Sequence, residues 1–148
     1  MSYGYIRVAA VTPDTVVADT KANSESIVKW AKKAAEAGAQ IIVFPELSIT
    51  GYTCGELFFQ DTLLKGALEG LRYIAESTKS LDAVILAGLP LMYKGHLRNA
   101  ACAINHGKIL GFVPKMHLPN YSEFYEARYF KEGPGDVEYI DLPNGKCP

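Results

Sequence analysis

The sequence lacks an excess of either charge. It has 15 Lys and Arg residues against 16 Asp and Glu residues, which gives a net charge of −1 over 148 residues. Proteins that bind nucleic acid by neutralising phosphates carry a clear surplus of basic side chains on one face. We therefore expect no nucleic-acid partner.

Long apolar runs are also missing. No stretch reaches the roughly 20 apolar residues that a membrane-spanning helix needs. The first eleven residues carry Arg7 and no small-residue cleavage site behind an apolar core, so they do not resemble a secretory signal. These absences predict a cytoplasmic protein without a membrane partner.

Cysteine is scarce, and its spacing is uninformative. The three cysteines, Cys54, Cys102 and Cys147, form no CxxC pair, which argues against a disulfide framework and against a zinc site. The three histidines have neither HExxH spacing nor a neighbouring cysteine pair. We expect reduced thiols, no metal ion and no cofactor bound to this chain.

What the sequence does contain is an alternation of strand-like and helix-like segments. With 49% hydrophobic residues, a chain of this length has enough apolar side chains for a single core. The predicted strands are 5–11, which we expect to be buried, 40–44, 83–88, 98–104 and 108–113. The predicted helices are 20–38, ended by Gly38, and a stretch that begins after Asp61, a plausible N-cap, and ends near 80. Residues 105–107, which end in glycine, predict a short hairpin loop between the last two strands. The β-α-β-α-β opening predicts an α/β fold with a parallel sheet, and the continuous apolar run 40–44 suggests helices on both faces.

The last predicted element is a hairpin. Residues 137–142 have strand character, and Pro143, Asn144 and Gly145 give a strong turn signal three residues before the last one, Pro148. The sequence therefore predicts a returning strand that is cut off inside a hairpin. We expect residues 1–148 to form part of a domain rather than a complete one.

Two loops place charged side chains directly after predicted strands. Glu46 follows the strand 40–44, and Lys115 follows the strand 108–113. The carboxyl ends of strands are where open α/β sheets place their ligand sites. We expect Glu46 and Lys115 to lie within ion-pair reach at the ends of adjacent central strands, where they could act as general base and oxyanion stabiliser.

A plainer interpretation of the same residues stays open. Single Glu and Lys side chains in loops are usually solvated, and aromatic residues at this density usually pack rather than bind ligands. Glu123 and Glu126 could be ordinary exposed acids, with Arg128 paired to either one. The chain would then be a non-catalytic α/β interaction module, with charges that are solvated and well separated.

Two segments resemble a known enzyme family. FPELSITGYTCGELF around Glu46 and GFVPKMHLPNYSEFYEARYFKEG around Lys115 resemble the nitrilase superfamily of carbon–nitrogen hydrolases. Within it, GYTCGELF and PNYSEFYEARYF are most similar to the N-terminal glutaminase domain of glutamine-dependent NAD synthetases. The resemblance implies a four-layer α-β-β-α sandwich, of which this chain would be roughly the N-terminal half.

The resemblance also implies roles for individual residues. Glu46 matches the general base of a Glu-Lys-Cys triad, and Lys115 matches its transition-state stabiliser. A second family glutamate best matches Glu126, with Glu123 as the alternative. The family nucleophile lies downstream of residue 148, so we expect this chain alone to be inactive. The positions that match aromatic residues of the family's substrate pocket are Tyr52, Tyr121 and Phe124.

As a whole protein, the family member would hydrolyse glutamine and pass ammonia to a synthetase domain. That domain, absent from this chain, would use ATP and Mg²⁺ to amidate nicotinic acid adenine dinucleotide to NAD. A homo-oligomer is expected. A free-standing amidase or carbamoylase with the same triad is the alternative within the superfamily.

Overall fold

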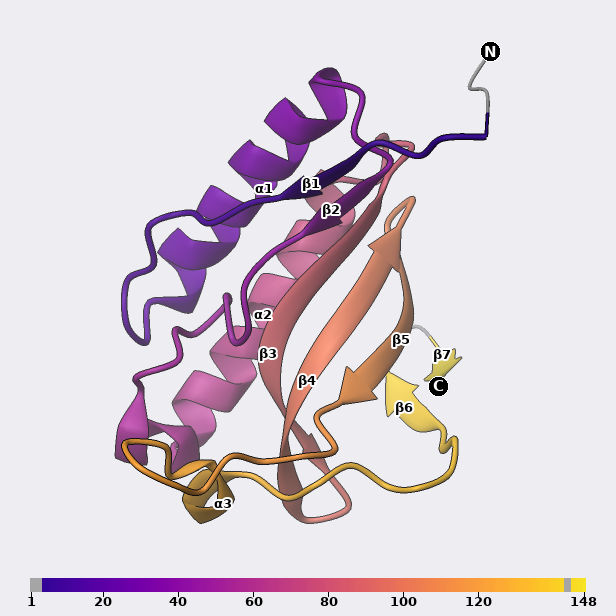
Figure 1. Ribbon diagram of the computed structural model, residues 1–148. Coiled ribbons are helices and arrows are strands. Elements are labelled where there is room, and N and C mark those ends of the chain that lie inside the picture. Colours follow the sequence, from indigo (N-terminus) through magenta and orange to yellow (C-terminus); the bar gives the residue numbers. More distant parts are fainter. Residues whose placement is uncertain (1–3, 143–144) are drawn as a thin grey trace.

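The computed structural model describes residues 4–142 and 145–148, and its centre is a five-stranded sheet (Figure 1). The strand order is β1-β2-β3-β4-β5. The first three strands are parallel, and β3, β4 and β5 follow one another as antiparallel neighbours. The strands are β1 Val8–Ala10, β2 Ile41–Val43, β3 Val84–Tyr93, β4 His96–Asn105 and β5 Lys108–Pro114.

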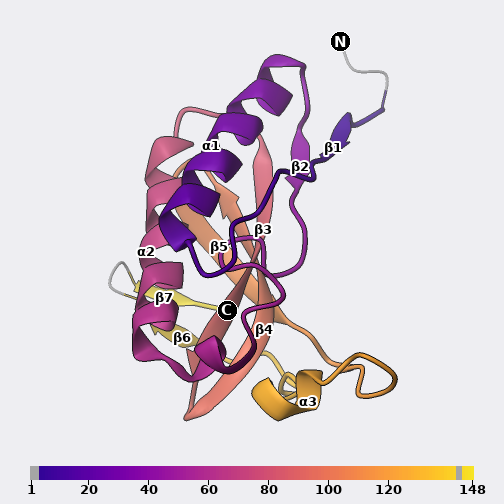
Figure 2. The ribbon, with the colours of Figure 1, turned by 90° about the vertical axis from the view of Figure 1, so that its left-hand side faces the viewer.

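Two long helices, α1 (Thr20–Glu36) and α2 (Asp61–Ser77), cover one face of this sheet (Figure 2). The Asp19 side chain caps α1 by accepting a hydrogen bond from the backbone N–H of Ala22 at 2.9 Å. The predicted stop of α1 at Gly38 is confirmed, since this glycine has the positive φ of 85° that favours glycine after a helix. Asp61, which has the residue type of an N-cap, is instead the first residue of α2, after Gln60.

The main core lies between these helices and the sheet. Its fully buried side chains include Ile27 from α1, Ile42 from β2, Ile74 from α2 and Ile85 from β3. The helices approach each other closely at Gly70, where an added Cβ would lie 2.3 Å from the Ser24 hydroxyl oxygen. The absence of a side chain at this position allows the tight contact between α1 and α2.

β3 and β4 are longer than the sequence pattern predicts. The predicted end of the third strand at Leu89 and Pro90 is wrong, because β3 continues to Tyr93. β2 pairs with β3 only as far as Leu86, so Pro90 lies where β3 has β4 as its partner and no β2 beside it. A proline is tolerated on such an edge because one ladder N–H is not needed there.

Short hairpin turns connect the antiparallel strands. The predicted turn before Lys108 is confirmed: His106 and Gly107 both have positive φ angles, 47° and 76°. The same conformation occurs at Lys94 and Gly95, with φ angles of 47° and 74°. Two-residue turns with positive φ at both positions match the twist of the strands that they join.

The remaining elements lie at the sheet's ends and side. The strands β6 (Ile140–Leu142) and β7 (Gly145–Cys147) pair antiparallel as predicted, whereas residues 143 and 144 of the expected turn lie outside the described residues. The 3₁₀ helix η1 (Gly55–Phe59) was not predicted, and α3 (Glu126–Tyr129) is a single helical turn. Both lie at the lower end of the molecule in Figure 1.

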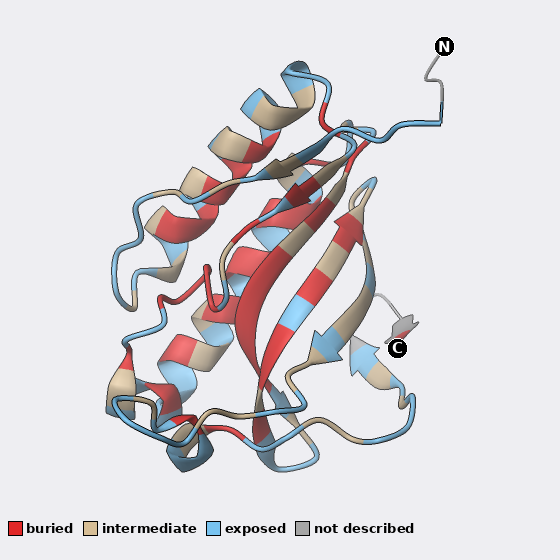
Figure 3. Cartoon of the chain, in the orientation of Figure 1, coloured by how far each residue is buried: buried red, intermediate tan, exposed pale blue. Residues whose placement is uncertain are grey.

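The sheet face turned away from α1 and α2 is open. Val43 is 39% exposed and Val113 is 71% exposed on this face, which is turned toward the viewer in Figure 3. The expectation of helices on both faces is therefore wrong for the described residues. β1, expected to be buried, is an exposed edge strand. None of the described helices has the length and apolar character to cross a membrane.

We predict that the 148-residue chain self-associates through this open face. Contiguous exposed apolar patches beyond a few hundred Å² are rare on monomers, and burying them is favourable. Size-exclusion chromatography with light scattering should show a mass that rises with protein concentration. Val113→Thr should weaken the association, whereas Val16→Thr, in an exposed loop outside the sheet, should not. A concentration-independent monomer would contradict this prediction.

Candidate active site

The loops after β2 and β5 reach the same end of the sheet. β5 runs parallel to β2 because two antiparallel steps separate it from β3, which is itself parallel to β2. The predicted convergence of Glu46 and Lys115 is confirmed, since the Lys115 Nζ lies 2.8 Å from the Glu46 Oε1. The predicted adjacency of their strands is wrong, because β3 and β4 lie between β2 and β5.

The Glu46 loop crosses directly over β3 at Gly88. A Cβ at this position would lie 2.3 Å from the backbone nitrogen of Leu47, closer than any real contact. The Gly88 carbonyl accepts a hydrogen bond from the Ile49 N–H at 3.1 Å, and the Gly88 N–H donates to the Ser48 hydroxyl, also at 3.1 Å. Because Gly88 has no side chain, the loop that carries Glu46 can lie against β3 and is held there by these two hydrogen bonds.

Lys115 bridges two carboxylates. Its Nζ donates to the Glu46 Oε1 and, at 2.9 Å, to the Glu126 Oε1. Partial burial of Lys115, the largest single influence, favours a lower pKa. The hydrogen bonds and charges of the two carboxylates outweigh it, so the pKa of Lys115 is raised above its usual range. The side chain is therefore an ammonium ion at neutral pH.

Glu126 is the buried member of this group. Only 4% of its surface is exposed, and its Oε1 also accepts a hydrogen bond from the Tyr52 hydroxyl at 2.7 Å. Burial first, and then the bond and charge of Glu126, raise the pKa of Tyr52, so the phenol keeps its proton. The Glu126 Oε2 is buried without a hydrogen-bond partner among the described residues.

Asn99 is a site residue that was not predicted from the sequence. It lies on β4, is 4% exposed, and donates from Nδ2 to the Glu46 Oε1. Its backbone carbonyl accepts a hydrogen bond from the Lys115 N–H at 2.7 Å. The available signal was an amide side chain beside the apolar run Ala100 to Ile104 of the same strand, because buried polar side chains need specific partners.

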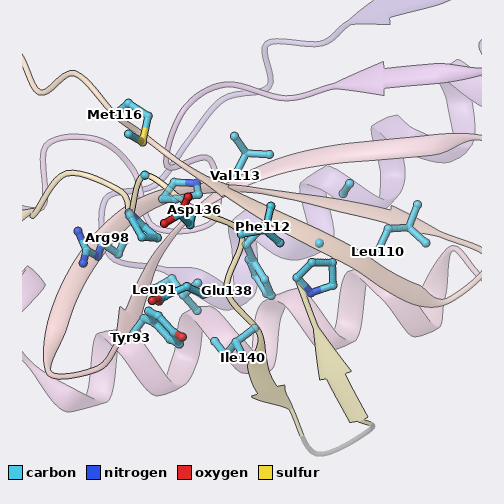
Figure 4. Close-up of a pocket in the computed structure, with 17 residues that line it drawn as sticks. Leu91, Tyr93, Arg98, Leu110, Phe112, Val113, Met116, Asp136, Glu138 and Ile140 are labelled. Carbon is cyan, nitrogen blue, oxygen red and sulfur yellow. The ribbon is translucent and has the colours of Figure 1, made fainter.

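These residues line a shallow depression of about 330 Å³ on the open side of the sheet. Glu46, Asn99 and Lys115 contribute its polar groups, and Gly88 and Val113 lie in its walls. A larger depression of about 510 Å³ is lined by residues of β3, β4 and β5 and by the segment that leads to β6 (Figure 4). Its lining is mainly apolar and contains none of the bridged carboxylates, so we assign the chemistry to the smaller depression.

The three cysteines do not join the site. The Cys54 Sγ donates to the Thr50 carbonyl at 3.1 Å and packs in a small cluster with Phe58 and Phe130. Cys102 is fully buried under the helices, and the Cys147 Sγ lies near the Ile109 carbonyl. Burial raises the pKa of all three thiols, which disfavours the nucleophilic thiolate.

The other residues considered as site candidates lie outside the depression beside Glu46. Tyr121 and Phe124 pack against each other, with ring centroids 5.8 Å apart, and do not line the depression at Glu46. Glu123 is solvent-exposed, so the carboxylate that contacts Lys115 is Glu126. Arg128, expected to pair with Glu123 or Glu126, pairs with Glu56 at 2.7 Å. Among the described residues, no group of His, Cys, Asp and Glu side chains is arranged to hold a metal ion.

Gly88→Ala should displace the Glu46 loop. The new methyl group would overlap the Leu47 backbone, and backbone cannot move aside as a flexible side chain can. We expect the free energy of unfolding to fall by roughly 2 kcal/mol in urea denaturation. Gly135→Ala is the control, because a Cβ at that position would meet no atom within 4 Å. Equal stability of the two variants would contradict the close approach.

Lys115→Met should destabilise the fold at neutral pH. The substitution leaves the buried Glu126 carboxylate with Tyr52 as its recorded partner, and we expect a loss of roughly 2 kcal/mol in the free energy of unfolding. Adding Glu126→Gln should recover part of the loss, because no charge then stays buried. Lys94→Met, which breaks the exposed pair with Glu138, should change stability little.

The pH dependence of this loss has a definite sign. The folded-state pKa of Lys115 is raised, so its stabilising contribution is complete below the unfolded-state pKa of about 10.4 and disappears as the pH rises through the higher folded-state value. The stability difference between the wild-type chain and Lys115→Met should therefore shrink in strongly alkaline solution. A difference that stayed constant to about pH 12 would argue against the bridge.

Comparison with known proteins relates this arrangement to a family. Residues 7–147 match the family model described as carbon-nitrogen hydrolase. The chain is 37% identical over 134 residues to the glutamine-dependent NAD(+) synthetase of Mycobacterium tuberculosis, covering 90% of this chain and 20% of that protein. It is 39% identical over 117 residues to the enzyme of the same name from Aquifex aeolicus, covering 79% of this chain and 20% of that protein.

Solved structures agree with the sequence matches. A glutamine-dependent NAD(+) synthetase from Cytophaga hutchinsonii superposes with a TM-score of 0.90 and 30% identity, over 97% of this chain and 24% of that chain. An amidase from Nesterenkonia, at 23% identity and a TM-score of 0.74, shares the fold over 93% of this chain and 51% of its own. The chain spans about a fifth of the length of the curated relatives that it matches. It belongs to the carbon–nitrogen hydrolase family.

Proposed function

We propose that residues 1–148 are part of a glutamine amidohydrolase domain whose ammonia is used to convert nicotinic acid adenine dinucleotide to NAD. The observation that carries the proposal is the Lys115 ammonium held between Glu46 and Glu126 beside a depression at the strand ends. The relatives that are 37% and 39% identical are named glutamine-dependent NAD(+) synthetases, which supports glutamine as the substrate. The 2.8 Å pair does not support the non-catalytic alternative, which required separated, solvated charges.

The proposed chemistry is covalent amide hydrolysis. Glu46 takes the proton of a cysteine thiol, and the thiolate attacks the side-chain amide carbon of glutamine. Lys115 stabilises the oxyanion that forms, and Glu46 returns the proton to the leaving ammonia. Water, deprotonated by Glu46, then hydrolyses the thioester and releases glutamate. Glu126 holds the Lys115 ammonium in place throughout.

Further parts of this function lie outside the described residues. The nucleophilic cysteine is proposed to come from sequence beyond residue 148, because the three thiols present are buried away from Glu46. ATP and Mg²⁺ would act in a separate synthetase domain. We propose that the protein acts in the cytoplasm, where free thiols stay reduced. We also propose that it forms a homo-oligomer.

Substrate binding is proposed to involve the aromatic residues near the site. Tyr52 reaches the site through its hydroxyl, which donates to Glu126. Tyr121 is 70% exposed and packs on Phe124, and its exposed ring is available to contact a substrate. Aromatic rings of this kind exclude water from a reaction centre when a substrate binds.

Glutamine hydrolysis by the longer protein tests the proposal. Glu46→Gln should lower kcat for ammonia release by about 1,000-fold, because the amide cannot accept the thiol proton. Glu56→Gln is the matched control, since Glu56 lies in η1 and pairs with Arg128 instead of Lys115. If the two variants were equally active, Glu46 would not be the general base.

The 148-residue chain should release no ammonia from glutamine. Each of its thiols is buried, and none lines the depression beside Glu46 and Lys115. Turnover by this chain that disappeared in Cys54→Ser or Cys147→Ser would place the nucleophile within residues 1–148. A longer protein that hydrolysed other amides but not glutamine would favour the amidase alternative.

A further inference from the structure

Asn99 connects the two halves of the site. The β4–β5 pairing ends at Ala100 and Pro114, and the next hydrogen bond runs from the Lys115 N–H to the Asn99 carbonyl. The backbone of Asn99 therefore sets the point at which the Lys115 loop leaves β5. Its side chain contacts the other half of the site, at Glu46.

The Asn99 side chain restricts how the Glu46 carboxylate can turn. Its Nδ2 and the Lys115 Nζ both donate to Oε1 of Glu46. Among the described residues, the recorded hydrogen bonds to this carboxylate both end on that one oxygen. The second oxygen, Oε2, is left to accept a proton. A carboxylate with one oxygen held by two donors is oriented as a general base needs to be.

We propose that Asn99 is a positioning residue that holds Oε1 of Glu46 so that Oε2 faces the reacting group. The role suits a neutral donor. The site already contains Glu46, Lys115 and Glu126, and a further charge would change how Glu46 binds its proton. Because Asn99 is 4% exposed on a paired strand, its amide is held in place before any substrate arrives.

The charged and titratable groups around Glu46 come from three elements. Lys115 belongs to the loop after β5 and contacts Glu46 directly. Glu126, at the start of α3, acts through Lys115. Tyr52 lies in the loop after β2, and the negative charges of Glu46 and Glu123 both help to raise its pKa. None of these groups changes in Asn99→Asp or Asn99→Leu, so a change in the titration of Glu46 reports on position 99.

Asn99→Asp and Asn99→Leu separate charge from hydrogen bonding. Both side chains are close to asparagine in size, and both leave the backbone bond to Lys115 intact. Asn105→Asp is the matched control, because Asn105 lies on the same strand and its Nδ2 donates to the Ala83 carbonyl, away from Glu46. If Asn99→Leu does not fold, the smaller polar variant Asn99→Ser replaces it, with the same expected loss of orientation.

The first measurement needs no enzymatic activity. Carbon-13 NMR of the Glu46 side-chain carboxyl group in the 148-residue chain follows its titration. Asn99→Asp places a second carboxylate beside Glu46 and should move the titration midpoint upward by about one pH unit. Asn105→Asp should leave the midpoint unchanged. An unchanged midpoint in Asn99→Asp would overturn the proposal.

The second measurement rests on the proposed function. In the longer protein, both Asn99 variants should lower kcat for glutamine hydrolysis by about 100-fold, with KM changed less than about threefold. Only Asn99→Asp should also shift the acidic limb of the pH–rate profile upward. Wild-type protein without glutaminase activity would refute the proposed function, while the NMR titration would still decide the role of Asn99. Folded Asn99 variants with wild-type kcat and pH profile would refute that role.

Discussion

The ammonium group of Lys115 is the interaction on which the site depends. It lies between two carboxylates that come from different parts of the chain, Glu46 after β2 and Glu126 in α3. Neither carboxylate would be stable in the same place without a cation, because two like charges at this separation repel each other and Glu126 is buried. One positive side chain thus joins the loop after β2, the loop after β5 and α3 at the end of the sheet.

The sheet supplies the rigidity that this arrangement needs. β3 and β4 form a long hairpin that extends past β2. Gly88 on β3 and Asn99 on β4 line the same depression as Glu46 and Lys115, which the two loops carry. Gly88 lets the Glu46 loop lie directly on β3, and Asn99 bonds to both Glu46 and Lys115. Groups on paired strands are more precisely placed than groups on free loops, and precise placement is what acid–base chemistry requires.

The two faces of the sheet have different environments. α1 and α2 close one face into a conventional apolar core, with residues such as Ile42 and Ile85 fully buried. The opposite face has no helix among the described residues and leaves Val43 and Val113 exposed. The site opens on this second face, so whatever covers the apolar surface also determines how water and substrate reach Glu46 and Lys115.

Local patterns in the sequence determined much of the fold. Apolar periodicity identified α1 and α2, the short apolar runs identified β2 and the start of β3, and the turn before Lys108 identified the β4–β5 hairpin. These features depend on neighbouring residues, through side-chain period and turn conformation, and so can be inferred without tertiary contacts. The position of charged residues after strands also pointed correctly to Glu46 and Lys115.

Only the tertiary structure decided the features that depend on partners distant in the chain. The continuation of β3 through Pro90 required knowledge that β2 stops pairing at Leu86. Asn99 is one of several polar residues on β4, and only the tertiary structure places it beside Glu46, 53 residues away. Glu126 and Glu123 have the same chemistry and lie three positions apart, yet burial and contact with Lys115 select Glu126. The sequence determines which groups are available, whereas the packing of the loops determines which of them meet, because that choice depends on long-range contacts.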